Sequence, residues 1–374
     1  MNQNRSIRVL VVPDKFKGTL SAEKVCAAIA KGWRSVRPGD ELDLLPMSDG
    51  GDGFGEVLAR LTKARVRKVK TVNAAHQPIA AAWWWDSVQK VAIVEAARVN
   101  GLVVLPEKRF HPFQLDTFGL GNVLREASRI GARSCLIGIG GSATNDGGFG
   151  LAKSLGWRFL NQHGQQLEQW WQQVHLRRIV PPQKLLKLRV TVAADVANPL
   201  LGKQGCSRVY GPQKGLLPDD IAHAEKCLGQ LRRVVKQQTG CDYATTPGAG
   251  AAGGLGFGLM CFISARLRSG FEIFAKTARL EKRIRQADLV ITGEGALDRQ
   301  TCMGKGVGQV GLLCRELKVP CLALAGVVND PAQVGRLFTQ FRALVEITAL
   351  KHARKHPQRY LERLSALMAG EYEF

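Results

Sequence analysis

The first sixty residues alternate between short apolar runs and stretches whose apolar positions have helical spacing. Residues 7–12 form an apolar run that predicts a buried strand. A helix is predicted from Ser21, a good N-cap residue with Glu23 in the following turn. A second strand is predicted at 42–46 and a second helix at 54–61. This alternation favours an α/β fold with a largely parallel sheet.

The pattern changes in the next segment. Residues 66–94 contain several short β-prone runs separated by turns, which predict a strand-rich, antiparallel stretch and indicate a change of domain. An amphipathic helix is then predicted at 120–130, a buried strand at 134–139 and a further strand at 185–193. Two further strands, predicted at 289–292 and at 319–325, both end in glycine-containing loops. That arrangement is typical of half of a Rossmann-like sheet.

The composition adds one unusual feature, a formal net charge of +22 on 374 residues. A positive field of this kind attracts nucleotides, acidic metabolites, nucleic acid or anionic lipid, but it does not specify a fold or a reaction. The basic clusters at 63–70, 279–285 and 351–355 are interleaved with apolar residues, as on the solvated face of a strand or helix. A nucleic-acid-binding protein therefore stays open as an alternative, although no RRM, KH or helix-turn-helix signature supports it.

Targeting and cysteine patterns narrow the class of protein further. The apolar run at 7–12 is too short for a signal peptide, and no apolar stretch reaches the roughly 18 residues of a membrane span. We therefore expect a soluble, cytoplasmic protein that does not engage a membrane. The nine cysteines are scattered and form no C-x-x-C pair, so we expect reduced thiols and neither a disulfide framework nor a zinc site.

The candidate chemistry lies in five glycine-rich loops that follow strands or open helices. They are residues 48–53, 138–148, 195–199 with 211–215, 247–256, and 292–298 with 304–306. In α/β sheets ligands bind at the carboxyl ends of strands, and backbone N–H groups at helix N-termini favour phosphate. A tight turn or a helix cap remains the alternative for each loop taken alone. Several of the loops also carry acidic, hydroxyl or lysine side chains, which a turn does not need.

Individual side chains in these loops suggest roles. The 138–148 loop follows a buried strand and brackets hydroxyls with glycines, which makes it a candidate anion cradle. Asp195 is predicted at a strand end, and Lys214 lies in a Gly-Pro turn where it can meet a phosphate. Glu294 and Asp298 follow another strand end and are candidates to share a Mg²⁺ ion. No Walker A motif occurs, and the G-x-G-x-x-G at 248–253 lacks the preceding strand of a dinucleotide fingerprint.

Taken together and in this order, the loops resemble the bacterial type I glycerate kinase family. The resemblance runs from about residue 8 to about residue 330. The matching stretches are PDKFKG at 13–18, DGGDG at 49–53, GIGGSATNDGG at 138–148, DVANPL at 195–200, GPQKG at 211–215, PGAGAAGGLG at 247–256 and ITGEG at 291–295.

The resemblance implies a two-domain α/β protein. A Rossmann-like parallel-sheet domain would be built from both chain ends, residues 1–70 and 286–374, with a mixed α/β domain inserted at 71–285. It also implies ATP and Mg²⁺ as partners and D-glycerate as the acceptor. The expected product is 2-phosphoglycerate, with 3-phosphoglycerate as the rival. A homodimer is one open option for its assembly, and nucleic acid is not an expected partner.

We assign the site residues as a hypothesis. The catalytic residues are Asp195, which accepts the proton of the glycerate hydroxyl, Lys214, which holds phosphates, and Lys17, which attracts the glycerate carboxylate. Asp14, Lys15, Asp49 and Gly50 bind the acceptor, and Glu294 and Asp298 hold Mg²⁺. The phosphate and nucleotide positions are Gly140, Gly141, Ser142, Thr144, Asn145, Gly250, Gly253 and Gly254.

Some residues depart from the pattern of the family. Lys15 stands where serine is common, Asp52 replaces a usual glutamate, and the segment 95–101 reads EAARVNG where small residues are usual. Lys15 and Arg98 are therefore candidates to alter the fit of the substrate. Two alternatives follow, a kinase of another small hydroxy acid and a non-catalytic ligand-binding protein on the same fold. The retained carboxylates Asp195, Glu294 and Asp298 argue against the second.

Overall fold

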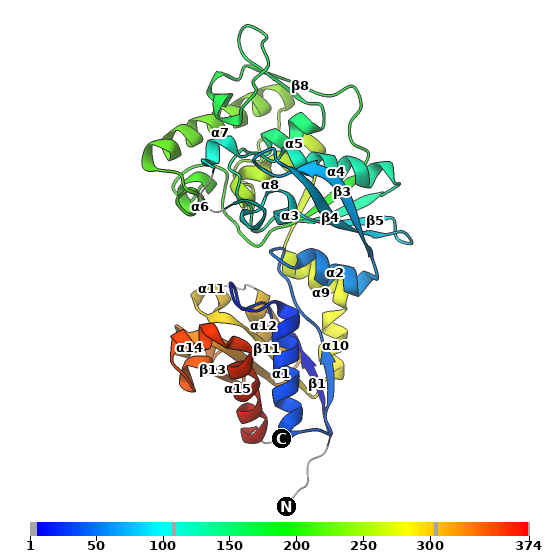
Figure 1. Cartoon of the computed structure of the whole chain (residues 1–374), viewed down its shortest axis with the longest axis vertical. Helices are drawn as coiled ribbons and strands as arrows, with labels where there is room; N and C mark the ends of the chain where they lie inside the picture. The colour runs from blue at the N-terminus through cyan, green and yellow to red at the C-terminus, as the bar shows by residue number, and fades with distance from the viewer. Residues whose placement is uncertain (1–5, 107–109, 303–305, 373–374) are drawn as a thin grey trace, which may run out of the picture. The chain divides into compact units, whose positions relative to one another are not determined.

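The computed structural model describes residues 6–106, 110–302 and 306–372, and it has a mixed α/β fold. The chain divides into two compact units (Figure 1). Unit one comprises residues 1–49 and 271–374, and unit two comprises residues 50–270. In the sequence analysis, the two boundaries were placed after residues 70 and 285. Residues 50–70, predicted for the first domain, lie in unit two, and residues 271–285, predicted for the inserted domain, lie in unit one.

Unit one is built on a five-stranded parallel sheet. Its order is β13 (Gln340–Ala343), β12 (Cys321–Val328), β11 (Leu289–Leu297), β1 (Arg8–Val11) and β2 (Glu41–Leu44). The strands predicted at 7–12, 42–46, 289–292 and 319–325 are thereby confirmed. The apolar residues of β1, of 289–291 in β11 and of 321–325 in β12 are almost fully buried, as expected for parallel strands covered on both faces, whereas Leu44 of the edge strand β2 is 40% exposed.

Two helices from opposite ends of the chain pack together in unit one. Helix α1 (Ala22–Val36) and helix α15 (Pro357–Glu371) lie side by side, drawn blue and red (Figure 1). Ser21 caps α1 by accepting a 3.4 Å hydrogen bond from the backbone N–H of Lys24, as its sequence position predicted. A Cβ added to Gly32 would lie 2.0 Å from the carbonyl oxygen of Glu362, so the two helices pack with one backbone against the other.

Unit two contains a six-stranded mixed sheet. Its order is β10 (Arg266–Arg268), β9 (Arg189–Ala193), β6 (Ser134–Gly138), β5 (Val91–Glu95), β4 (Pro78–Asp86) and β3 (Arg65–Val72). The first four strands run parallel, whereas β4 is antiparallel to both β5 and β3. The predicted antiparallel stretch at 66–94 is thus confirmed, and it forms one side of this sheet.

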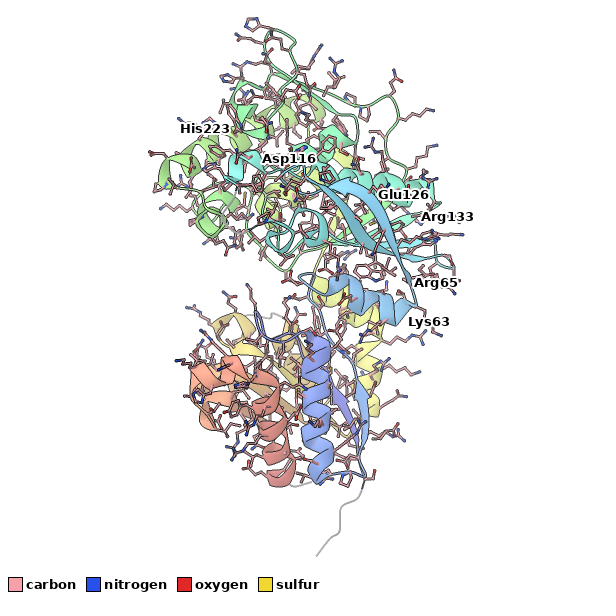
Figure 2. All side chains as sticks on the ribbon, in the orientation of Figure 1. Lys63, Arg65, Asp116, Glu126, Arg133 and His223 are labelled. Atoms are coloured by element: carbon pink, nitrogen blue, oxygen red, sulfur yellow. The ribbon has the colours of Figure 1, made fainter. Side chains whose placement is uncertain are left out.

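Helices cover the sheet of unit two. The main core packs α4 (Phe118–Arg129) and α8 (Ala251–Ile263) against the strands, and a second core lies around α7 (Pro218–Thr239). Asp116 precedes α4 in the interior of the unit, whereas Glu126 of α4 lies at its outer edge (Figure 2). Among the described residues, no helix is both long and apolar enough to cross a membrane.

The remaining elements are short or connect these layers. The nine cysteines are free thiols, and six of them are buried. The other helices and strands are α2 (Phe54–Thr62), α3 (Ala97–Asn100), α5 (Phe149–Ser154), β7 (Arg158–Leu160), β8 (Arg178–Val180), α6 (Cys206–Lys214), α9 (Gly270–Ala278), α10 (Leu280–Gln286), α11 (Arg299–Cys302), α12 (Gly306–Glu316), α13 (Pro331–Val334) and α14 (Leu350–Lys355), with 3₁₀ turns at Leu102–Val104, Pro112–Gln114, Trp170–His175 and Leu344–Glu346.

Candidate functional site

Three of the predicted loops meet at one edge of the sheet in unit two. Strands β5, β6 and β9 end in register at Glu95, Gly138 and Ala193. The carbonyl oxygen of Gly50 accepts a 3.2 Å hydrogen bond from the N–H of Gly140. A Cβ on Gly50 would also lie 3.0 Å from the carbonyl oxygen of Ala193. The loops therefore come together at the carboxyl ends of parallel strands, where the sequence predicted a ligand site.

The 138–148 loop is lined by buried polar side chains. The hydroxyls of Ser142 and Thr144 are 2.9 Å apart, and the side-chain amide of Asn100 reaches Ser142 at 3.4 Å. The Asn145 amide donates a 2.9 Å hydrogen bond to Ser207. Among the described residues, the side-chain carbonyl oxygens of Asn100 and Asn145 have no hydrogen-bond partner. Buried polar atoms without partners are rare in folded proteins, and here they gather at the predicted anion cradle.

Asp146 holds the end of this loop. Its carboxylate accepts hydrogen bonds from the Thr117 hydroxyl at 2.7 Å and from the N–H groups of Thr117, Gly148 and Gly150 at 2.9 to 3.1 Å. Burial, together with the charge of Asp116, raises the pKa of Asp146 to about 6. In the sequence analysis, Asp146 was included in the 138–148 loop but was assigned no role. Its partner Thr117 is 29 residues away, and no local pattern indicates that contact.

Lys214 contacts the backbone of the same loop. Its ammonium donates a 2.7 Å hydrogen bond to the carbonyl oxygen of Thr144. The side chain is half-buried at the end of α6, and the partial loss of water around it lowers its pKa to about 8. Lys214 and the 138–148 loop, which were each predicted to bind phosphate, are therefore in contact in the structure. Its contact with a phosphate remains a prediction.

The fourth predicted loop packs against the second and third. The N–H of Gly147 donates to the carbonyl oxygen of Gly253 at 3.0 Å, and the N–H of Gly250 donates to Asn198 at 2.9 Å. Gly253 and Gly254 have left-handed φ values of 70° and 85°. A Cβ on Gly253 would lie 2.0 Å from the carbonyl oxygen of Thr144. The small residues thus allow the backbone of α8 to touch the 138–148 loop.

Asp195 follows β9 at the same edge, as predicted. Its Oδ1 accepts a 3.0 Å hydrogen bond from the N–H of Gly270, where α9 begins, and one of 3.4 Å from the hydroxyl of Ser269. The carboxylate is therefore tied to the end of unit two. Its role as proton acceptor remains a prediction.

Unit one contains a separate group of acidic side chains at the carboxyl ends of its strands. Glu294 lies in β11, and burial raises its pKa to about 7, with smaller contributions from the charges of Asp14, Asp298 and Asp49. The Thr301 hydroxyl donates a 2.7 Å hydrogen bond to Glu294. The structure thus brings together four predicted residues. Sequence reasoning missed Thr301, because nothing in its local context marks it as a partner of Glu294.

The loop at 13–18 lies beside this acidic group. The N–H of Asp14 donates to the carbonyl oxygen of Gly293 at 2.8 Å, and the N–H of Lys15 donates to the Asp14 carboxylate at 2.7 Å. A Cβ on Gly295 would lie 3.4 Å from the backbone nitrogen of Lys17, whose side chain is exposed. Both lysines therefore belong to the same region of unit one as Glu294.

These carboxylates are compatible with a magnesium ion, although they do not form a closed metal cage. Within the described ranges, no group of three or more His, Cys, Asp or Glu side chains is arranged to hold a metal. Mg²⁺ commonly uses only one or two carboxylates and takes its other oxygens from phosphate and water. Burial is the main cause of the raised pKa of Glu294, and the charges of Asp14, Asp298 and Asp49 add to it, so a bound cation would favour the ionised carboxylate here.

Comparison with known proteins identifies the family. The model of the glycerate kinase family matches residues 9–372. This chain belongs to the glycerate kinase family. The family consists of ATP-dependent phosphotransferases with an alcohol group as acceptor, so the chain is a kinase.

Its relatives match over most of its length. The chain is 35% identical over 327 residues to a glycerate kinase of Halalkalibacterium halodurans, covering 86% of both chains. It is 34% identical over 334 residues to a glycerate 2-kinase of Escherichia coli K12, covering 88% of this chain and 87% of the relative. A crystal structure of a Salmonella typhimurium LT2 protein assigned as glycerate kinase 2 matches with a TM-score of 0.81 at 31% identity, covering 98% of both chains. The mixed α/β fold is therefore shared with this family.

Proposed function

We propose that this kinase transfers the γ-phosphoryl group of ATP to D-glycerate and forms 2-phosphoglycerate, with 3-phosphoglycerate as the less favoured product. The observation that carries the proposal is the meeting of the glycine loops around Lys214 at the strand ends of unit two. The choice of the 2-hydroxyl is supported by the E. coli relative, which is named a glycerate 2-kinase.

Phosphoryl transfer depends mainly on positioning and on neutralising charge. In our proposal, Lys214 and the donors of residues 140–145 bind phosphate oxygens, and Gly250, Gly253 and Gly254 shape the backbone around them. Lys15 and Lys17 attract the glycerate carboxylate, and Asp14, Asp49 and Gly50 bind the rest of the acceptor. A Mg²⁺ ion held by Glu294 and Asp298 would supply charge neutralisation of the phosphates when bound.

The reaction balances without a covalent enzyme intermediate. The glycerate hydroxyl oxygen forms a bond to the γ-phosphorus while the bond between that phosphorus and the bridging oxygen of ADP breaks. Asp195 accepts the hydroxyl proton. A carboxylate is a sufficient base because, in a loose transition state, the proton leaves late.

We further propose that the chain is of the type I subclass, acts in the cytoplasm and uses its two compact units as two domains. The resemblance of all seven quoted stretches to that subclass supports the first point. In this proposal the net charge of +22 attracts the anionic substrates, and the protein has no nucleic-acid partner.

The test is an ADP-release assay with ATP, Mg²⁺ and D-glycerate, using coupling enzymes that accept either 2- or 3-phosphoglycerate but not both. Glycerate-dependent ADP release that couples only through the 2-phosphoglycerate enzyme is the expected result. Turnover with a different small hydroxy acid but not with glycerate would show that the acceptor is wrong. Ligand binding without turnover, in folded protein, would favour the non-catalytic alternative.

A further inference from the structure

Helix α2 begins against an acidic side chain at the end of strand β5. The two carboxylate oxygens of Glu95 accept hydrogen bonds from the N–H groups of Gly53 and Gly55, each at 3.2 Å. Glu95 is only 5% exposed. The first N–H groups of a helix have no partner within the helix and attract negative charge. Here the protein itself provides that charge, so these two amide donors are already in use.

Arg98 lies in the short helix α3, three residues after Glu95, and forms an ion pair with it. Its Nε lies 3.5 Å from Oε2 of Glu95, and its terminal nitrogen donates a 2.6 Å hydrogen bond to Glu56 of α2. Its guanidinium also lies 5.0 Å from the centre of the Trp84 ring. Arg98 is therefore engaged by two carboxylates and an aromatic face, which is the geometry that a planar guanidinium favours.

The same tryptophan supports α2 directly. A Cβ added to Gly55 would lie 1.9 Å from Cζ3 of Trp84, so the first turn of α2 rests on the indole ring. Trp84 belongs to β4 and is 7% exposed. Helix α2 is thus fixed to the ends of two strands, by packing on β4 and by hydrogen bonds to β5.

What this contact fixes is the loop that leads into α2. Gly50 is hydrogen-bonded to Gly140, and a Cβ on Gly141 would lie 2.6 Å from Oδ1 of Asp52. The segment 50–53 therefore lies against the predicted phosphate loop at one end and against Glu95 at the other. Any displacement of the start of α2 would shift both Gly50 and Asp52.

We propose that Arg98 and Glu95 are positioning residues that hold the 50–53 loop in place for binding of the acceptor. Arg98 acts through Glu95 and Glu56 and does not contact the substrate. In this proposal Arg98 alters the fit of the substrate through the position of the 50–53 loop. The inference rests on the proposed function for its effect on kinetics, but the contact itself can be tested without turnover.

The first experiment measures amide hydrogen exchange of residues 53–58 in Arg98→Ala. Removing the guanidinium leaves the buried Glu95 carboxylate without its ion-pair partner, which should weaken its hold on the Gly53 and Gly55 amides and speed their exchange by about tenfold. The matched control is Arg129→Ala, which removes an arginine from an exposed Arg–Glu pair on α4, whose partner Glu126 lies at the outer edge of unit two (Figure 2). Equal exchange of residues 53–58 in the two variants would overturn the proposal.

The second experiment separates positioning from simple support of the fold. In Arg98→Ala we expect the KM for glycerate to rise about fivefold or more, with the KM for ATP within about twofold of the wild type. Arg98→Lys keeps the charge but cannot bridge two carboxylates as a fork, so it should restore the KM only in part. Faster exchange with an unchanged KM for glycerate would reduce Arg98 to a structural residue and overturn its positioning role. If the wild-type protein does not phosphorylate glycerate, the proposed function fails, whereas the exchange result still decides whether the contact orders the loop.

Discussion

The ammonium of Lys214 is hydrogen-bonded to the carbonyl oxygen of Thr144 at 2.7 Å, although 70 residues separate them. The contact places a half-buried positive charge against the backbone of the 138–148 loop. In the proposed mechanism this charge is held ready for phosphate before the nucleotide arrives. Preorganised charge of this kind costs no rearrangement at the moment of reaction.

Lys214→Met should therefore impair catalysis much more than folding. Methionine fills a similar volume but cannot donate to Thr144 or neutralise a phosphate. We expect kcat/KM for ATP to fall about 100-fold or more. The melting temperature should change little, because the lost hydrogen bond is offset by the removal of a half-buried charge. Steady-state kinetics and thermal melting check this, and near-normal kcat/KM would remove Lys214 from phosphate binding.

The lowered pKa of Lys214 predicts a pH dependence. Its folded-state pKa is about 8, below the usual 10.5, so the unfolded chain binds more protons between these values. Stability contributed by this residue should rise as pH increases from about 8 to 10.5. The affinity for ATP should fall as the pH rises through about 8, because Lys214 then loses its positive charge. The KM for ATP measured from pH 7 to 9.5 tests this, with Lys214→Met as a control that should lack the lysine-dependent change.

Much of the fold was predictable from the sequence, because strands such as residues 7–12 and caps such as Ser21 depend on local patterns. The meeting of the loops was also predictable, because carboxyl ends of parallel strands share an edge. Side-chain partners were not. The contacts of Asp146 with Thr117, of Glu95 with Gly53 and of Thr301 with Glu294 are set by packing between distant or irregular segments.

Asp195→Asn tests the proposed base. Asparagine keeps an oxygen that can accept the hydrogen bond from the Gly270 N–H, so the start of α9 should be preserved. It cannot accept the hydroxyl proton, and we expect kcat to fall by about 10² to 10⁴. The KM for ATP should stay within about threefold. Rapid-quench measurements of the chemical step would decide the matter, and a nearly normal rate would exclude Asp195 as the base.

Thr301→Val tests the acidic group of unit one. The Thr301 hydrogen bond lowers the pKa of Glu294, and its loss should raise that pKa further above the present value of about 7. More of Glu294 would then be protonated at neutral pH and unable to bind a cation. We expect a several-fold higher Mg²⁺ concentration for half-maximal activity at pH 7, and a smaller difference at pH 8.5. An unchanged Mg²⁺ requirement at both values would argue against Glu294 as a ligand.

A pair of glycines separates backbone strain from close contact in the fourth loop. Gly253 and Gly240 have nearly the same left-handed φ, 70° and 71°. A Cβ on Gly253 would lie 2.0 Å from the Thr144 carbonyl oxygen, whereas nothing lies within 4 Å of a Cβ on Gly240. Gly240→Ala should cost about 1 to 2 kcal/mol of unfolding free energy from the left-handed conformation alone. Gly253→Ala has the same strain and must also displace the 138–148 loop, so we expect a loss about 2 kcal/mol larger, together with weaker ATP binding.

Urea denaturation of both variants measures the difference. Equal losses would mean that α8 and this loop can separate at little cost, and the loop would then not be held by the contact described here.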